Sequence, residues 1–206
     1  MALVDTTLQT ALLLSFNSMV GMTSGGDRFM ANKLALAIKA FVLTANVSTV
    51  DAGTVSITSV YAGNGSGAPG CFVIDSDTLE DELYETFTME NPTDDDIADG
   101  IADNIDTVCS EKNIIKTTTT GTLTPPPPAT PISPYVGTGK GTFSGVKTII
   151  SEKLKAAFSA MKSMITGGDL YFAQEFASAV GNYLRGGTVT VKLDEPIVGS
   201  GTGGVS

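Results

Sequence analysis

The sequence repeats itself at a step of 71 residues, and this periodicity limits the possible folds more than any other feature of the chain. The step takes Leu8 to Leu79 and Leu79 to Ile150. Two further sets keep the same step, at i+4 and i+8 within each repeat: Leu12, Leu83 and Leu154, then Phe16, Phe87 and Phe158. Residues spaced in this way lie along one side of an α-helix, so each repeat is predicted to begin with an amphipathic helix whose stripe is buried.

A turn and a second helix follow the first helix in every repeat. Each turn ends in a carboxylate: Asp27, Asp94 and Asp169. Because the first N–H groups of a helix lack partners within it, we interpret these three residues as helix caps. The second helix carries alanine at two equivalent positions in each repeat: Ala31 and Ala35, Ala98 and Ala102, Ala173 and Ala177. Alanine at these positions predicts close packing against a neighbouring helix.

After the second helix the hydrophobic period changes from helical to alternating. The predicted strands, rich in β-branched residues, cover residues 46–50, 113–116 and 188–191. Turns are expected at residues 51–53, before a returning strand, and at residues 194–196. Each repeat is therefore a helix–turn–helix–strand unit in sequence.

Each repeat closes with three glycines at alternate positions. They are Gly63, Gly65 and Gly67; Gly137, Gly139 and Gly141; and Gly199, Gly201 and Gly203. Glycine permits backbone to approach backbone, so we predict that these glycine-rich tails lie at contacts between subunits, through edge pairing or close packing.

The fold class predicted from this pattern is α+β, with three tandem helix–turn–helix–strand modules that share one core. An arrangement of the modules about a pseudo-threefold axis is one option. The modules span residues 1–75, 76–146 and 147–206. The middle module holds a Thr- and Pro-rich insertion at residues 117–134, with four consecutive prolines. Such a tract favours extended backbone, so we expect a spacer or a surface arm there.

The residues predict no catalytic, cofactor or metal site. The chain has no histidine, which removes the usual general base of a Ser or Cys nucleophile. The glycine-rich residues 137–142 suggest a phosphate loop, but Gly141 stands where that loop needs Ser or Thr after its lysine. The aspartates of residues 94–106 fit a solvated helix face, with a divalent cation as the alternative. Cys71 and Cys109 lack metal-ligand spacing, and we interpret them as free thiols of a reducing compartment.

The charge and hydropathy of the chain exclude two classes of partner. A net charge of -10 and a pI near 4.3 disfavour binding to nucleic acid or to an anionic membrane. The most apolar stretch, residues 34–43, is too short to cross a bilayer. Residues 1–16 lack the basic region and cleavage site of a secretory signal, so we expect them to belong to the mature protein.

The helix pairs, the Thr- and Val-rich strands and the ending at residues 197–204 resemble small virion structural proteins of tailed bacteriophages. The resemblance implies a non-enzymatic assembly protein in a capsid decoration, neck, tail or baseplate, made in the host cytoplasm and located in the virion. Its implied partners are other virion proteins and copies of itself, and it carries over no catalytic residue and no cofactor. A carbohydrate- or ligand-binding adhesin-like module is the second hypothesis, and a hydrolase with carboxylate chemistry is the third.

Overall fold

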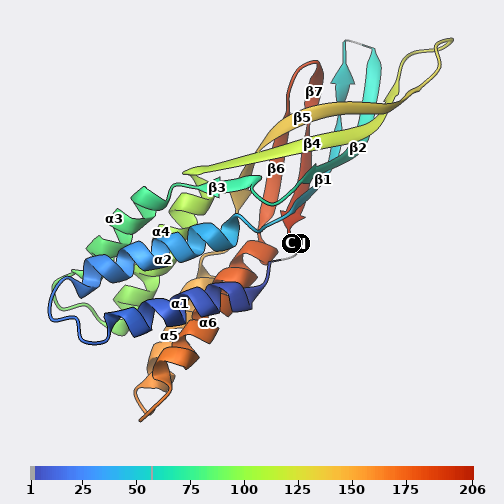
Figure 1. The fold of residues 1–206 in the computed structure, drawn as a ribbon. Coiled ribbons are helices and arrows are strands. Elements are labelled where there is room, and N and C mark those ends of the chain that lie inside the picture. Colours follow the sequence, from blue (N-terminus) through green and yellow to red (C-terminus); the bar gives the residue numbers. More distant parts are fainter. Residues whose placement is uncertain (1–2, 57) are drawn as a thin grey trace.

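The computed structural model describes residues 3–56 and 58–206, and within these ranges the chain forms six helices and seven strands in two layers placed end to end (Figure 1). The helices are α1 (Asp5–Met19), α2 (Gly26–Val42), α3 (Ser76–Phe87), α4 (Asp94–Ser110), α5 (Thr148–Met161) and α6 (Gly168–Gly186). The strands are β1 (Val47–Val55), β2 (Ser59–Gly67), β3 (Phe72–Ile74), β4 (Asn113–Thr124), β5 (Ile132–Ser144), β6 (Thr188–Leu193) and β7 (Ile197–Val205).

The helices form a closed ring. Each helix packs on the next along the chain, and α1 packs on α6. The stripe predicted at the 71-residue step is buried along its first two positions, and each of these side chains is at most 1% exposed: Leu8, Leu12, Leu79, Leu83, Ile150 and Leu154. The paired alanines of α2, α4 and α6 are likewise at most 1% exposed, which confirms the predicted close packing of these helices.

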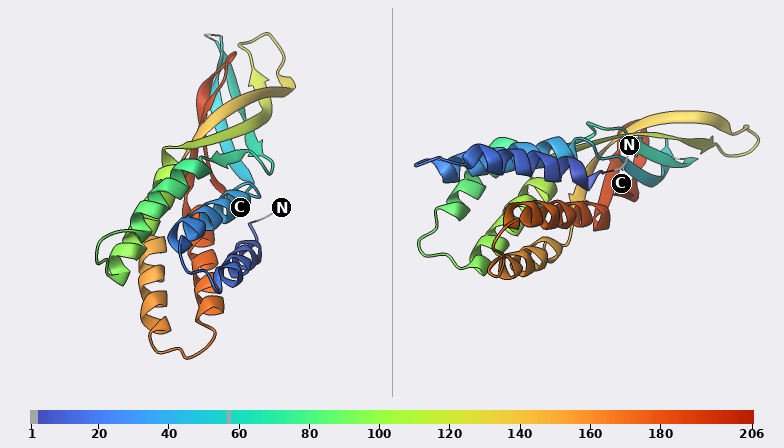
Figure 2. Two further views of the ribbon diagram at one scale, coloured as in Figure 1. Left: turned by 60° about the vertical axis from the view of Figure 1, so that its left-hand side comes forward. Right: turned by 60° about the horizontal axis from the view of Figure 1, so that its bottom comes forward.

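The strands form a closed antiparallel barrel. Six of the strands in the described chain follow the order β2-β1-β7-β6-β5-β4, and pairing of β2 with β4 closes the barrel. β3 adds to β4 beside this ring. Figure 2 shows the consequence for the shape: the helices lie at one end of the molecule and the hairpin tips at the other. Phe143 of β5 contacts Phe72 and Tyr183 at centroid distances of 5.5 and 5.4 Å, and this aromatic cluster joins the two layers.

Neighbouring strands contribute differently to the interior of the barrel. β1, β4 and β6 point side chains inward, whereas β2, β5 and β7 each place three glycines at successive inward positions, with larger inward side chains such as Tyr61 nearer their ends. Because barrel diameter grows with strand number, six strands leave less room than eight, in which side chains just fill the interior. Gly65, for instance, lies between Thr49 of β1 and Thr119 of β4 in register. The nine glycines are thus parts of strands, and the glycine-rich tails of the sequence analysis do not exist as tails.

The structure contradicts the predicted fold class of three tandem helix–turn–helix–strand modules. The fold is α+β, but its six helices and its closed six-stranded barrel are built from the described chain as a whole. A lone hairpin would leave two edges unpaired, and these edges pair with the hairpins of the other repeats. The predicted boundaries after residues 75 and 146 fall just before α3 and α5, while the barrel draws strands from all three segments.

Two local predictions are also wrong, because the strands of the barrel run through residues that were predicted as a turn and a spacer. Residues 51–53 lie inside β1, which continues to Val55 before it turns. Most of the expected spacer at residues 117–134 is strand: Thr117 and Thr119 are buried in β4, and Pro134 lies in β5. Only the proline-rich connection between these two strands remains outside the barrel. By contrast, the predicted strand starts at Asn113 and Thr188 and the turn at residues 194–196 are confirmed, and the first strand begins at Val47, one residue after its predicted start.

The narrow barrel predicts that one methyl group added to an inward glycine lowers the free energy of unfolding. A Cβ at Gly203 would overlap the backbone carbonyl oxygen of Ser48, so Gly203→Ala must separate β7 from β1. We expect a loss of about 2–3 kcal/mol of unfolding free energy, in the upper range for overpacking. Denaturant unfolding followed by circular dichroism measures it.

Gly186→Ala is the matched control, because a Cβ there meets only the side chain of Ile149 at 3.7 Å. It should leave stability unchanged or raise it by up to about 1 kcal/mol, since alanine favours a helix over glycine. Equal losses in the two variants would contradict the account of the narrow barrel.

Candidate functional site

The ring of helices opens into an apolar cavity at the end away from the barrel. The cavity has a volume of about 510 Å³, and every helix of the ring contributes to its wall. Its lining residues are Phe16, Met19, Met30, Leu34, Phe87, Ile97, Ile101, Phe158, Met161, Asp169 and Phe172. Leu34 and Ile101 are buried and close the cavity at depth, whereas the phenylalanines from the three repeats are half-buried around its sides.

The position of these phenylalanines corrects one prediction. Phe16, Phe87 and Phe158 were expected to be buried like the rest of the stripe. Instead they converge on one shared cavity and are only half-buried. Phe172 is tilted against Phe16 at 5.9 Å and stacked on Phe158 at 5.4 Å, which makes one side of the wall a continuous aromatic surface.

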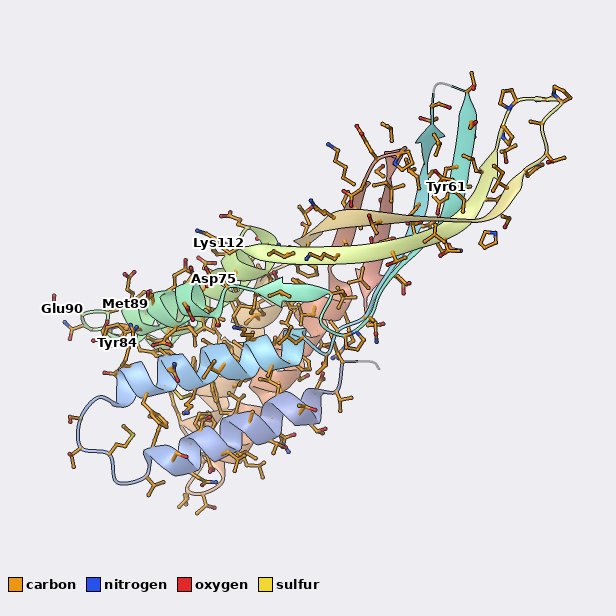
Figure 3. The ribbon with its side chains drawn as sticks, turned by 45° about the horizontal axis from the view of Figure 1, so that its top comes forward. Tyr61, Asp75, Tyr84, Met89, Glu90 and Lys112 are labelled. Carbon is orange, nitrogen blue, oxygen red and sulfur yellow. The ribbon has the colours of Figure 1, made fainter. Side chains whose placement is uncertain are left out.

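Exposed apolar side chains surround the mouth of the cavity. The helix connections at this end carry Val20, Met22, Met89, Met164 and Ile165, and Leu170 follows in the first turn of α6. Ile165 is 98% exposed and Val20 is 83% exposed. Figure 3 shows Met89 at this end, beyond α3 and beside Glu90. Together with the cavity these residues form an apolar surface, which we call the helix tip; surfaces of this kind mark interaction sites.

The rim of the helix tip is acidic. Asp27, Asp94 and Asp169 were predicted as helix caps, but the caps are Gly25, Thr93 and Gly167. The three aspartates lie instead in the first turns of α2, α4 and α6, where a carboxylate still interacts favourably with the positive end of the helix dipole. All three first turns belong to the same end of the ring, so the fold gathers these carboxylates around one mouth.

Two cations of the same end, Arg28 and Lys162, are already paired. Arg28 contacts Glu80 at 2.9 Å and Asp81 at 2.8 Å, and Lys162 contacts Asp94 at 2.7 Å. The rim carboxylates of Asp27, Glu90 and Asp169 have no ion-pair partner within the part of the chain that the structure describes. The helix tip therefore combines an apolar centre with uncompensated negative charge at its edge.

The other aspartates of α4 do not form a cation site. Lys155 of α5 reaches Asp99, and Lys147, just before α5, reaches Asp103, each at 2.8 Å. Together with the pair of Lys162 and Asp94 they form a row of ion pairs between α4 and α5. The hydrogen-bonded carboxylates raise the pKa of these exposed lysines. No group of three metal-ligating side chains occurs among residues 3–56 and 58–206. The aspartates of this face thus serve helix packing.

The glycines predicted as assembly contacts make their close approaches within the chain. Gly137, Gly139 and Gly141 lie in β5 and face Ile197, Val191 and Ile115 in the barrel interior. The residues compared with a phosphate loop are therefore part of a strand and not a loop before a helix. Contact of any of the nine glycines with another chain stays a prediction.

The barrel interior holds one buried carboxylate. Asp51 is 1% exposed; its Oδ1 accepts a hydrogen bond of 2.7 Å from the hydroxyl of Thr49, and its Oδ2 has no hydrogen-bond partner among the described residues. Nearby along the barrel, Tyr61 and Thr119 share a hydrogen bond of 2.6 Å between their hydroxyls. Asp51 packs against the inward glycines Gly65 and Gly201, which leaves no room for a substrate beside it.

The two cysteines are free, as predicted, and neither is placed for chemistry. Burial raises the pKa of the Cys109 thiol far above its usual range, and the nearby Asp106 raises it further. Burial also raises the pKa of Cys71. A thiol of raised pKa forms little thiolate, which is the nucleophilic species, so neither residue is activated for attack.

Comparisons with known proteins found no protein similar to this chain. The sequence matches no protein-family model, and searches of curated proteins and of solved structures found no match. Among the described residues, no helix has both the length and the apolar character that a membrane crossing needs.

The open cavity predicts that truncation of a buried leucine lowers the free energy of unfolding more than truncation of a larger phenylalanine at the cavity. Leu83→Ala should cost about 2–5 kcal/mol, because Leu83 is 0% exposed in the closed part of the ring. Phe87→Ala removes more atoms but from a half-buried ring beside an open cavity, so it should cost only about 1–2 kcal/mol. Thermal or denaturant unfolding of the two variants tests this order, and a greater loss for Phe87→Ala would contradict the open cavity.

The burial of the two thiols predicts how fast each cysteine is alkylated. Alkylation of the folded protein by iodoacetamide should leave Cys109 unmodified and modify Cys71 slowly, whereas both should react in denaturant. Mass spectrometry of peptides identifies the modified residue. Rapid labelling of Cys109 in the native protein would show that the ring of helices opens around it.

Proposed function

We propose that the protein is a non-enzymatic assembly protein that binds a partner through the helix tip. The observation that carries the proposal is the apolar cavity of about 510 Å³, bordered by side chains such as Ile165 that are almost fully exposed. Leaving these side chains in water costs free energy that burial against a partner would recover. Binding of a partner at this surface explains the exposed apolar side chains, which the stability of an isolated monomer does not require.

The remainder of the chain supports a binding role over catalysis. The cavity wall contains one ionisable side chain, Asp169, and it lies at the exposed rim. The buried polar groups of the barrel are packed against glycine and strand backbone, away from the cavity. Catalysis by acid–base or nucleophilic groups requires such groups at a site that a substrate can reach, and neither the apolar cavity nor the packed barrel interior combines the two.

A place in a tailed-phage virion is the finer form of this proposal, and it rests first on the sequence resemblance. The elongated shape, with a helix tip at one end and hairpin tips at the other, supports a component that bridges two neighbours (Figure 1). On this proposal the helix tip contacts another virion protein, and the outer surface of the barrel is available to a second one or to a copy of the chain.

The test uses one apolar residue of the helix tip and one elsewhere. Ile165→Glu should abolish incorporation of the protein into the high-mass particle of its source, because the substitution places a charge in the contact. Leu14→Glu is the control: Leu14 is 64% exposed on α1, away from the connections. Sedimentation of the particles followed by mass spectrometry measures incorporation. Free monomeric protein in the source, or equal incorporation of both variants, would refute the proposal.

A further inference from the structure

The walls of the cavity restrict what can occupy it. Small-molecule sites combine apolar surface with a few placed polar groups that fix the orientation of the ligand. Here the buried and half-buried lining residues are all apolar, and Asp169 at the rim is the one polar side chain. A ligand wholly inside the cavity would find no group to orient it. Apolar side chains whose own backbone stays at the mouth fit this wall better.

The apolar surface also extends beyond the cavity. Val20 and Ile165 are far more exposed than the lining phenylalanines and stand on connections at the mouth. An occupant that buries both the cavity and these side chains must project residues inward and cover the mouth at the same time. An amphipathic helix does so, because it presents several large side chains at i, i+3, i+4 and i+7 along one face.

Charge selects among the remaining occupants. Asp27, Glu90 and Asp169 surround the apolar centre without ion-pair partners in residues 3–56 and 58–206. A second copy docked tip to tip would bring two acidic rims together, and an anionic membrane would face the same repulsion from a chain of net charge -10. A segment with Lys or Arg beside its apolar face is attracted by the same rim.

Resting on the proposed function, we infer that the helix tip receives the apolar face of a basic amphipathic helix from a partner protein. The large side chains of that helix enter the cavity toward Leu34 and Ile101, and its basic residues pair with the rim carboxylates. Apolar burial supplies the affinity, and the charges supply the selection and the speed of encounter.

The probes are two synthetic helical peptides of equal length, one of leucine and lysine and one of leucine and glutamate, with leucines at identical positions. Binding to the full chain is measured by fluorescence anisotropy of a labelled peptide. The lysine peptide should bind at least about tenfold more tightly than the glutamate peptide. Equal binding of the two peptides would overturn the selection by charge.

Two variants separate the cavity from the general acidity of the chain. Ile97→Trp fills the cavity without changing charge and should weaken the lysine peptide by about tenfold or more, whereas Leu14→Trp on the outer face should change binding by less than about twofold. The triple variant Asp27→Asn, Glu90→Gln, Asp169→Asn should weaken binding of the lysine peptide several-fold and reduce its dependence on salt. Unchanged binding in both the Ile97→Trp and the triple variant would mean that the peptide binds elsewhere, which overturns the inference.

Other occupants give distinct results. Insertion of a neutral naphthylamine dye that the lysine peptide fails to displace would assign the cavity to a small apolar molecule. Cosedimentation with phosphatidylglycerol vesicles that Ile165→Glu abolishes would assign it to a membrane, and a concentration-dependent dimer that Ile165→Glu abolishes would assign it to a second copy. If particle incorporation depends on Ile165 but neither peptide binds, the proposed function stands and this inference fails. If the lysine peptide binds as expected but incorporation ignores Ile165, the proposed function fails instead.

Discussion

The closure of six strands around a narrow interior is the constraint on which the rest of the molecule depends. Inward side chains on all six strands would overfill such a barrel, and the chain meets this by alternating strands that carry side chains with strands that carry glycine. Closure in turn fixes where the strands of each hairpin leave the barrel and where the preceding helix pair must stand. Because α1 meets α6 as β1 meets β7, the ring of helices closes above the ring of strands. The cavity at the helix tip is the far end of that ring, where no further layer covers it.

Much of the local structure could be predicted from the sequence, since it depends on patterns within one segment. The stripe from Leu8 to Leu12, the paired alanines of the second helices and the start of β6 at Thr188 all follow from periodicity. Strand pairing could not be predicted in this way, because each hairpin finds its partners far along the chain. A signal was nonetheless present. Glycine at every second residue, as in Gly199, Gly201 and Gly203, is the alternation of a strand whose inward positions must be empty, and the interpretation as a tail missed it.

The site was within reach of the same patterns. Phe16, Phe87 and Phe158 stand at the last position of the stripe in every repeat, so three large rings were bound to arrive at one end of any ring of these helices. What sequence alone could not give is how far the helix ends diverge, which decides between a filled core and an open cavity. The acidic rim followed a similar course: Asp27 and Asp169 were singled out for their place before a helix, and their shared location became evident only in three dimensions.

The contacts between the first and last elements make the fold circular in space, although the chain is linear. Asn46 and Ser206 exchange backbone hydrogen bonds of 2.9 and 3.0 Å, and the guanidinium of Arg185 in α6 grips the carboxylate of Asp5 in α1 at 2.8 and 2.9 Å. Neither ring has a first or a last member: consecutive helices pack on one another, consecutive barrel strands pair, and the contacts of α1 with α6 and of β1 with β7 close both rings. A circular permutant, opened in an exposed connection between two repeats and joined across the native termini by a short flexible linker, should reach the same barrel and the same ring.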